Sequence, residues 1–438
     1  MKPLLIQGGR IIDPGLGIDK TGSLLITEGK ISWVGETMPP HPDYDILHAS
    51  GLVVCPGFID LHCHLRQPGF EEKETIATGT QAAARGGFTT VCCMPNTSPP
   101  LDNEATINYV KSIAVKEGII RVLPIGCVTR GRRGEELVDM GEMETAGVIA
   151  YSDDGESVAS PQLMRQALDY SRAFDLPVID HCENKALSQG GQINEGVISL
   201  ELGLRGIPAA AEETIVHRDL ALARQTGGRL HIAHVSTRGS VELIRAAREQ
   251  GIRVTAEVTP HHLTLTEAAA LGFNTSAKVN PPLRTRQDIQ ALIQGLKEGV
   301  IDIIATDHAP HTEADKSCEF SQAAFGISGF ETALGSLMGL VHTGELSLNT
   351  LISRLTSEPA RILIHEKLGT LQIGAPADIT IFDPDREWVV EPRNFVSKGK
   401  NTPLAGSVLK GKIIATLFQG KPVYMDDSIK IEVRANYG

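Results

Sequence analysis

The chain has 438 residues, which suits one large domain with a smaller companion rather than a single small core. Its 41 Lys and Arg against 53 Asp and Glu give a formal net charge of −12, which argues against a nucleic-acid groove and against binding to an anionic membrane surface. The start, "MKPLLIQGGRIIDPG", lacks the features of a signal peptide, and no apolar run approaches ~18 residues, so we expect no membrane span. The seven cysteines include the adjacent pair Cys92 and Cys93 and no C-x-x-C spacing, which predicts reduced thiols and a cytoplasmic protein.

Both ends of the chain have the pattern of short strands. Residues 1–55 contain alternating segments such as "GSLLITEGKISWVG", and residues 365–438 contain similar ones such as "GAPADITIFDP". Gly and Asp punctuate these segments, which favours an antiparallel sheet. We therefore predict that the two ends pair into one small β-sandwich domain, which the middle of the chain interrupts.

In the middle of the chain, short apolar runs of β-forming residues alternate with helical patterns such as "SVELIRAAREQG". Eight such runs lie at residues 57–64, 88–96, 121–129, 147–155, 176–184, 229–236, 252–260 and 301–311. Strand and helix alternating eight times are typical of a (β/α)8 TIM barrel, and near-continuous apolar strands fit a parallel sheet buried on both faces. We predict an α/β fold with this barrel over residues 56–364; a doubly wound sheet is the alternative.

Polar residues of metal-ligand type lie at the trailing ends of five of these runs. They are His62 and His64, Asp153 and Asp154, His181, His234, and Asp307 and His308. In a barrel these strand ends open on one face, where active sites lie, and residues two apart on a strand share a side. Four imidazoles and two carboxylates from this set suit zinc or a similar divalent ion, and six ligands are more than one tetrahedral ion needs, which suggests two metals with one bridging carboxylate. Singly, each His is more often a packed core residue and each Asp a helix cap; their coincidence favours a metal centre.

Several segments resemble those of the dihydroorotases, a family of the amidohydrolase superfamily. The segment "DLHCHLRQP" (60–68) resembles the family's D-x-H-x-H-x-R pattern, and "ATDHAPHTEADK" (305–316) resembles its strand-eight signature, including the lysine. Further matching segments are "MPNT" (94–97), "EVTPHH" (257–262), "NPPLR" (280–284), "FGISGFET" (325–332) and "GAPADITIFD" (374–383). The resemblance covers nearly the whole chain.

The resemblance implies a centre of two Zn²⁺ ions. The implied ligands are, for the first ion, His62, His64 and Asp307, for the second, His181 and His234, and as the bridge between the ions, Asp154. Asp153 is the alternative bridge, because the segment reads "YSDDG" where many superfamily members have a carboxylated lysine. Cys63 points to the opposite face of its strand, so we expect it to pack rather than to bind metal.

The resemblance also implies a reaction, the reversible cyclisation of N-carbamoyl-L-aspartate to L-dihydroorotate and water in de novo pyrimidine (UMP) biosynthesis. A zinc-bound hydroxide would attack the ring amide, and Asp307 would act as general base and then as general acid. The alternative for Asp307 is a ligand role alone. The implied substrate contacts, with Arg66 on the substrate carboxylate, are His64, Arg66, Asn96, Asn280, His311, Phe325 and Gly326.

Residues 308–326 are polar and lack strong periodicity, so we expect a mobile loop that orders over the site when substrate binds. The nearest alternative function is another cyclic amidohydrolase, an allantoinase or a hydantoinase, whose substrates lack the carboxylate that Arg66 would bind. A second alternative is a non-catalytic partner of aspartate transcarbamoylase. The family suggests a homodimer, and association with the transcarbamoylase in addition to activity stays open.

Overall fold

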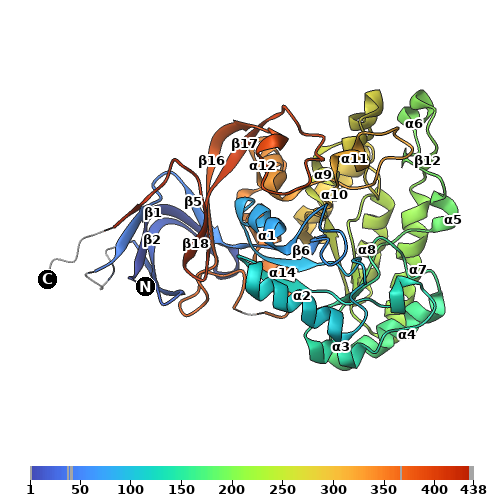
Figure 1. The fold of residues 1–438 in the computed structure, drawn as a ribbon, viewed down its shortest axis with the longest axis horizontal. Coiled ribbons are helices and arrows are strands. Elements are labelled where there is room, and N and C mark those ends of the chain that lie inside the picture. Colours follow the sequence, from blue (N-terminus) through green and yellow to red (C-terminus); the bar gives the residue numbers. More distant parts are fainter. Residues whose placement is uncertain (1, 37–38, 40–42, 366, 434–438) are drawn as a thin grey trace.

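The computed structural model describes residues 2–36, 39, 43–365 and 367–433. Two parts lie side by side, a β domain built from both ends of the chain and a larger α/β part built from its middle (Figure 1). Where predicted segments include residues 1, 37–38, 40–42, 366 and 434–438, those positions lie outside the described residues. Within the described ranges, no helix is both long and apolar enough to cross a membrane.

The β domain combines strands from both chain ends in one sheet. The strands are β1 (Leu4–Asp13), β2 (Ile18–Thr27), β3 (Lys30–Gly35), β4 (Asp45–His48) and β5 (Val53–Pro56) from the first end, and β16 (Ile379–Val389), β17 (Val408–Phe418), β18 (Lys421–Met425) and β19 (Ile431–Glu432) from the second. Their order is β18-β17-β16-β5-β1-β2-β3, with β4 and β19 paired beside it. β5 joins the two ends by pairing with β16, in a register that sets Val54 opposite Ile381. The predicted β-sandwich of both chain ends is confirmed.

The sheet of the β domain is mixed, so the expectation of a purely antiparallel sheet is wrong for two strands. β4 and β5 run parallel to β1. A parallel pair needs a long connection, and the β2–β3 hairpin supplies it between β1 and β4. The sheet buries a cluster of its own that includes Ile11, Leu24, Ile379 and Leu417, so residues far apart in sequence share one core.

Eight parallel strands form a closed ring in the α/β part. They are β6 (Phe58–Cys63), β7 (Phe88–Cys93), β8 (Arg121–Pro124), β9 (Tyr151–Ser152), β10 (Val178–Asp180), β13 (Leu230–Ile232), β14 (Val254–Val258) and β15 (Ile303–Ile304). β6 to β8 form one ladder, and β9, β10 and β13 to β15 form another. The bridges Gly126–Tyr151 and Cys63–His308 join the two ladders on both sides. Each predicted run contains one of these strands, and the prediction of an α/β TIM barrel is confirmed.

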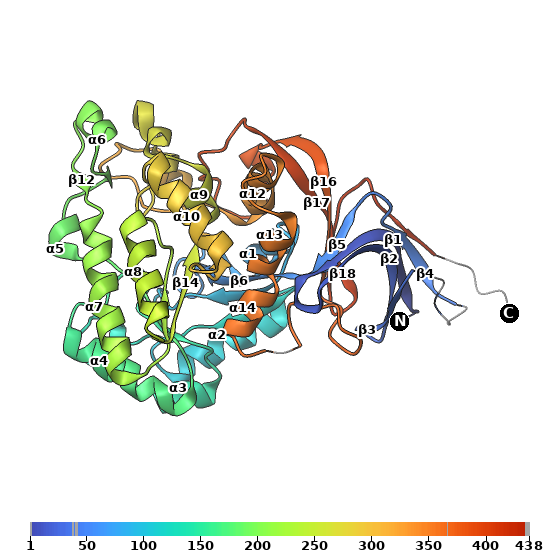
Figure 2. The ribbon, with the colours of Figure 1, turned by 180° about the vertical axis from the view of Figure 1, so that it is seen from behind.

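Helices cover the outside of the barrel (Figures 1 and 2). The longer ones are α1 (Ile76–Arg85), α2 (Glu104–Glu117), α3 (Met140–Ala146), α4 (Pro161–Ser171), α7 (Ala210–Thr226), α8 (Arg238–Glu249), α10 (Arg286–Glu298), α12 (Ala333–His342) and α13 (Leu348–Leu355). Short helices are α5 (Lys185–Ser188), α6 (Val197–Leu202), α9 (Pro260–Thr264), α11 (Glu313–Lys316) and α14 (Ser357–Ile362), and a two-stranded sheet pairs β11 (Ile193–Asn194) with β12 (Gly206–Ile207). Strand residues such as Phe88 and Ile232 share one buried cluster with helix residues such as Ile107 and Leu292.

One end of the barrel is covered by α14. Arg229, just before β13, donates to the carbonyl oxygen of Ile362 at 2.6 Å, and Asp302, just before β15, pairs with Arg361 at 3.4 Å. These contacts involve the amino ends of the strands, so the carboxyl ends face the other way and remain for the site.

The domain division predicted from the sequence, 1–55, 56–364 and 365–438, stays a prediction.

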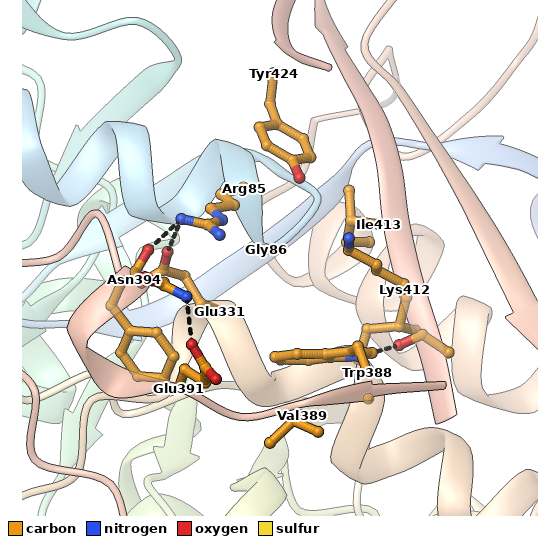
Figure 3. A pocket seen from close by; sticks show the side chains of 14 residues that line it. Arg85, Gly86, Glu331, Trp388, Val389, Glu391, Asn394, Lys412, Ile413 and Tyr424 are labelled. Carbon is orange, nitrogen blue, oxygen red and sulfur yellow. Dashed lines mark hydrogen bonds and ion pairs between the residues drawn. The ribbon is translucent and has the colours of Figure 1, made fainter. Parts of the chain in front are cut away.

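The β domain packs against α1 and α12 of the barrel. The hydroxyl group of Thr416 on β17 donates to the carbonyl oxygen of Ala84 on α1 at 2.7 Å. Beside this contact, a cavity of about 190 Å³ lies between α1, α12 and strands β16 to β18 (Figure 3). Figure 3 shows Arg85, Glu331 and Trp388 around it, with Arg85 Nη1 3.4 Å from Glu331 Oε1.

Candidate metal centre

The six predicted ligands lie together at the carboxyl end of the barrel. Each lies on a strand or within three residues of its end: His62 on β6, His64 after β6, Asp154 after β9, His181 after β10, His234 after β13 and Asp307 after β15. Parallel strands in a closed ring bring these ends to one face. Residues up to 245 positions apart in the chain therefore share one small volume, as Asp307 and His62 do.

Asp154 is at the middle of this cluster. Its Oδ1 lies 3.3 Å from Nε2 of His62 and 3.7 Å from both Nδ1 of His181 and Nε2 of His234. Its Oδ2 lies 3.5 Å from Nε2 of His64. Every imidazole of the cluster therefore faces the same carboxylate.

Asp307 approaches the first two histidines from the neighbouring strand. Its Oδ1 is 3.0 Å from Nε2 of His64 and 3.5 Å from Nε2 of His62. Two sets of ligand atoms, each with all atoms within 4.8 Å of one another, result: His62, His64 and Asp307, and His62, Asp154 and His234. His62 belongs to both sets, whereas the resemblance assigns it to the first ion alone. His181 adjoins the second set, because its Nδ1 is 2.8 Å from Nε2 of His234.

Asp153 points away from the cluster. Its Oδ1 accepts hydrogen bonds from the backbone N–H groups of Val128 at 2.9 Å and Thr129 at 3.1 Å, and the hydroxyl group of Thr129 donates to its other oxygen. These bonds hold its carboxylate against the segment that follows β8. The structure thus brings Asp154, and not Asp153, to the four imidazoles.

Three residues at this end of the barrel have a left-handed backbone, which non-glycine residues rarely adopt. The φ angle is 63° at Arg66, 32° at His234 and 45° at Asp307. Such conformations cost about 1–3 kcal/mol each and gather at functional sites. All three residues line one cavity, so the strained backbone accompanies side chains aimed into it.

Three of the histidines are held through the ring nitrogen that faces away from the cluster. The contacts are His62 Nδ1 to Glu257 Oε1 at 2.5 Å, His64 Nδ1 to Asn96 Oδ1 at 2.9 Å, and His181 Nε2 to Glu183 Oε2 at 3.1 Å. Because these oxygens only accept, each ring donates there and turns its other nitrogen toward the cluster, where it would offer a lone pair to a metal once its proton is lost. The partners therefore set both the tautomer and the direction of the rings.

The sequence analysis gave no role to Glu257 or Glu183. Glu257 is fully buried on β14 and also accepts from Nε2 of His231 at 3.1 Å. A carboxylate inside an apolar strand run is the signal that points to it. Glu183 stands two residues after His181, on the same side of the chain, and that spacing is the corresponding signal.

The carboxylates of the cluster are ionised at neutral pH. Burial alone would raise the pKa of Asp154 and of Asp307, but the imidazoles of His62 and His64 lower both below the usual range. Burial likewise opposes a low pKa for Glu257, yet its histidine partners lower it to about 2. Conversely, burial would lower the pKa of His62, and the surrounding carboxylates raise it. The carboxylates are thus in the form that binds a cation.

The residues of the cluster fit a zinc-type ion. Nε2 of His62 and Oδ1 of Asp154 are buried 3.3 Å apart, and neither has a hydrogen-bond partner among the described residues. Buried polar atoms rarely stay without a partner, and a bound cation would serve both atoms. Four imidazole nitrogens with two carboxylates are a donor set that Zn²⁺ prefers. Within the described ranges, neither of the two ligand sets contains a cysteine.

A cavity of about 740 Å³ opens over the cluster, a volume ordinary for a small-molecule site. Five of the six ligands line it; His62 lies beneath them, fully buried. The predicted substrate contacts that also line it are Arg66, Asn96, Asn280, His311, Phe325 and Gly326. The structure therefore brings every predicted site residue to one place, and it adds Glu183 and Lys185, which the sequence analysis missed.

Arg66 is a cation of this cavity. Its Nε donates to the carbonyl oxygen of Pro310 at 3.2 Å, and its Nη2 lies 3.3 Å from Nε2 of His311. That histidine nitrogen is 2.8 Å from the carbonyl oxygen of Phe325, to which it must donate, so it cannot accept from Arg66. Burial lowers the pKa of Arg66, but an arginine keeps its charge in proteins. Its guanidinium thus retains donors for a ligand.

Glu183 collects the polar groups on the other side of the cavity. Its Oε2 accepts from Nδ2 of Asn280 at 3.0 Å and pairs with Nζ of Lys185 at 2.7 Å. The backbone of Gly326, which the resemblance sets against the substrate ring, donates its N–H to the carbonyl oxygen of Lys278 at 2.9 Å. Groups from distant segments are therefore already tied together around the cavity.

A TIM barrel with a histidine and aspartate cluster at its carboxyl end, beside a β-sandwich of both chain ends, defines the amidohydrolase class. The amidohydrolase family model matches residues 207–424, and the dihydro-orotase-like family model matches residues 51–240. A dihydroorotase from Pelotomaculum thermopropionicum is 53% identical over 428 residues, covering 98% of this chain and 100% of the relative. One from Thermoanaerobacter sp. (strain X514) is 51% identical over 433 residues, with the same coverage. The chain belongs to the dihydroorotase family.

Solved structures show the same fold at lower identity. An L-hydantoinase (dihydropyrimidinase) from Arthrobacter aurescens has a TM-score of 0.89 at 25% identity, covering 99% of this chain and 98% of that one. A dihydropyrimidinase from Brevibacillus agri NCHU1002 has a TM-score of 0.85 at 22% identity, covering 98% and 97%. The resemblance read from the sequence motifs is confirmed at the level of the family.

Proposed function

We propose that this chain is a metal-dependent dihydroorotase, which interconverts N-carbamoyl-L-aspartate and L-dihydroorotate with water in de novo pyrimidine biosynthesis. Relatives named dihydroorotase, 51% and 53% identical over nearly the whole of both chains, support the proposal. The broader class, an enzyme that hydrolyses cyclic amides, has the same support together with the amidohydrolase family match.

The position of Arg66 carries the substrate assignment. Its guanidinium lies in the same cavity as the ligand cluster, and a guanidinium binds a carboxylate through two parallel hydrogen bonds. Dihydroorotate has a carboxylate on its ring, whereas hydantoin and allantoin have none. A site built for those two compounds would leave Arg66 without an anion, so hydantoinase or allantoinase activity ranks second.

Asp307 moves the proton in the proposed mechanism. Because its pKa is lowered, its carboxylate is ionised at neutral pH and accepts a proton from the attacking water. In ring opening it returns this proton to the ring nitrogen as the amide bond breaks, and in ring closure the transfers run in reverse. When bound, the metal polarises the amide carbonyl and lowers the pKa of water.

The cavity residues orient the substrate for this transfer. We assign the carboxylate to Arg66, flanked by Asn96 and His311, and the ring to Asn280 with the Phe325–Gly326 backbone. His64, held by Asn96, stands between the carboxylate site and Asp307. This arrangement would present the ring amide to Asp307.

The metal in this proposal is zinc, with two ions per chain. Asp154 would be the ligand shared by both ions, because all four imidazoles lie within 3.7 Å of its carboxylate oxygens. The proposed ligands are His62, His64, Asp154, His181, His234 and Asp307. Two overlapping ligand sets support two ions.

The test is ring opening of L-dihydroorotate, followed by loss of ultraviolet absorbance, on protein of known zinc content. Hydantoin and allantoin run beside it. We expect turnover of dihydroorotate alone, lost on chelation and absent in Asp307→Ala. Turnover of hydantoin or allantoin instead would favour the second-ranked activity. A fully metallated protein that turns over none of the three would leave the role of a non-catalytic partner of aspartate transcarbamoylase.

We further propose a cytoplasmic homodimer that associates with aspartate transcarbamoylase in addition to its activity. The seven unpaired cysteines support a reducing compartment. The dimer and the association rest on the family resemblance. Size-exclusion chromatography with light scattering, with and without the transcarbamoylase, tests both, and a mass of one chain would contradict the dimer.

A further inference from the structure

Two lysines are buried beside the cavity. Lys316 ends α11 and is 7% exposed, and Lys278 is 2% exposed. Lysine is rarely buried, because its ammonium loses water, and it then needs other hydrogen-bond acceptors. Here the acceptors are backbone carbonyl oxygens of two separate segments, 275–280 and 312–326.

The ammonium of Lys316 donates to three carbonyl oxygens. They belong to Thr275 at 3.1 Å, Lys278 at 3.2 Å and Ala324 at 2.6 Å. An ammonium has three N–H donors, so all of them are used. The hydroxyl group of Thr275 returns a hydrogen bond to the carbonyl oxygen of Lys316 at 2.7 Å. One side chain thus ties the 312–326 loop to the 275–280 segment at both of the loop's ends.

Lys278 makes a second connection in the opposite direction. It belongs to the 275–280 segment, and its ammonium donates to the carbonyl oxygens of Phe320 at 2.7 Å and Ser321 at 3.2 Å in the loop. The same ammonium lies 4.6 Å from the ring centroid of Phe325, a cation–π distance. The N–H of Gly326 donates to the carbonyl oxygen of Lys278.

Both segments carry groups that line the cavity. Asn280 stands two residues beyond Lys278, and Phe325 and Gly326 end the loop. The carbonyl oxygen of Phe325 also accepts from His311, as described above. The distance between the two segments therefore sets the width of the cavity on this side.

We propose that Lys316 and Lys278 are positioning residues that clamp the 312–326 loop to the 275–280 segment and so pre-form one wall of the substrate cavity. The part of this proposal that concerns substrate rests on the proposed function. The clamp replaces the expectation of a loop that orders only when substrate binds. The wall is formed before substrate arrives, which avoids an ordering cost on binding.

Burying the two lysines costs free energy because their ammonium groups lose water, and their hydrogen bonds to carbonyl oxygens offset that cost. Loss of water lowers the pKa of Lys316 to about 7 and the pKa of Lys278 to about 8. An apolar side chain of similar length would fill the same space without this cost. It would leave three carbonyl oxygens without their lysine donor at position 316 and two at position 278, and substitution by methionine measures the effect of that loss.

Hydrogen–deuterium exchange of the metal-loaded full chain tests the clamp without substrate. In the wild type, we expect slow exchange of residues 312–326 that substrate changes little. Lys316→Met keeps the aliphatic stem and removes the donors, so exchange in this loop rises about tenfold or more through local opening. Lys116→Met is the matched control, since Lys116 lies on α2 with its side chain 77% exposed, and it leaves the loop unchanged.

Kinetics separate positioning from general stability. In Lys316→Met the KM for L-dihydroorotate rises about tenfold or more, because substrate contacts on the loop are misplaced, while kcat falls less and zinc content stays the same. Lys316→Arg restores the KM only in part, since a planar guanidinium cannot aim at three carbonyl oxygens as an ammonium does.

Unchanged loop exchange in Lys316→Met, or a wild-type loop that becomes slow only with substrate, overturns the clamp. Faster exchange with an unchanged KM overturns the positioning role. If Lys316→Met does not fold by circular dichroism, Lys278→Met takes its place, because it removes two hydrogen bonds rather than three. A wild type without turnover counts against the proposed function instead, and the exchange comparison then decides the clamp alone.

Discussion

Two adjacent aspartates follow β9, and their carboxylates have different neighbours. Asp154 faces four imidazoles at 3.3–3.7 Å, and Asp153 accepts backbone N–H groups of the segment after β8. We expect Asp154→Asn to lose at least half of the bound zinc and about 100-fold or more in activity, because the carboxylate proposed to be shared by both ions loses its charge. Zinc content after dialysis, measured by mass spectrometry, checks this.

The control for that substitution is Asp153→Asn. It should keep its zinc, because its contacts lie outside the cluster. It should cost about 1–3 kcal/mol of unfolding free energy, since the N–H groups of Val128 and Thr129 lose a charged acceptor. The opposite pattern, with zinc lost from Asp153→Asn and kept in Asp154→Asn, would assign the bridge to Asp153.

Arg66 gives a second prediction at the residue scale. Arg66→Met should raise the KM for L-dihydroorotate about 100-fold, because charge-assisted hydrogen bonds to a carboxylate contribute about 1.5–3 kcal/mol. The KM of Arg66→Lys should lie between those of the wild type and Arg66→Met, because a lysine offers a point charge without the two parallel donors of a guanidinium. Zinc content should not change in either. Steady-state kinetics check both, and a KM within twofold of the wild type would remove Arg66 from the carboxylate site.

The sequence points to the proposed ligands more directly than to the residues that hold them in place. Strand-end position and motif resemblance point to His62 and Asp307 without a structure. Glu257 is different, because its contact with Nδ1 of His62 crosses from β14 to β6, and no local pattern encodes a contact across a barrel. The three acceptors of Lys316 are hidden for the same reason, since a motif marks the lysine but not the carbonyl groups around it.

At the element scale, the junction of α1, α12 and the β domain contains a buried carboxylate. Glu331, which Figure 3 shows beside Arg85, has a side chain that is 5% exposed. Its two carboxylate oxygens accept the backbone N–H of Val396 at 2.9 and 3.1 Å. Burial raises its pKa from 4.5 to about 7. The folded protein therefore holds this proton more tightly than the unfolded chain, and stability is lost as pH rises from 4.5 through 7. Over this range the free energy of unfolding falls by about 3 kcal/mol.

Glu331→Gln is neutral at every pH and should remove this loss. We expect the Tm difference, variant minus wild type, to be clearly more positive at pH 8 than at pH 5.5. Thermal unfolding at both pH values measures the difference, in which shared titrations cancel. Glu391→Gln, in the same cavity with a side chain 40% exposed, is the control and should show no such change. An equal Tm difference at both pH values would contradict the buried proton.

Elements are predicted from the sequence unequally, for physical reasons. Each of the eight barrel runs contains a strand, because a strand buried on both faces must be apolar throughout. The β domain is harder, since alternation reveals a strand but not its direction, and β4 and β5 pair parallel to β1 through partners distant in sequence. The loop before Gly326 lacks periodicity because backbone carbonyl groups, rather than an apolar face, hold it.

At the scale of the whole molecule, the proposed ligands come from five barrel strands, β6, β9, β10, β13 and β15, and from both ladders of the ring. A bound ion therefore joins the two ladders, which otherwise meet at isolated bridges such as Cys63–His308. Ligands that bind only the folded state stabilise it by mass action, by about 4 kcal/mol at a thousand times the Kd. We expect chelation to lower the Tm by several degrees and to abolish activity, and added zinc to restore both.

Exchange measurements locate that stabilisation. None of the proposed ligands lies in the described strands of the β domain, so chelation should speed amide exchange in β6, β9 and β15 and leave β1, β2 and β17 nearly unchanged. The barrel responds because the ion links strands that are far apart in the chain, whereas the β domain keeps its own core. A uniform rise in amide exchange over the barrel and the β domain would mean that the metal also stabilises the β domain through its junction with α1 and α12. No change in β6 and β15 would contradict a metal held by His62 and Asp307.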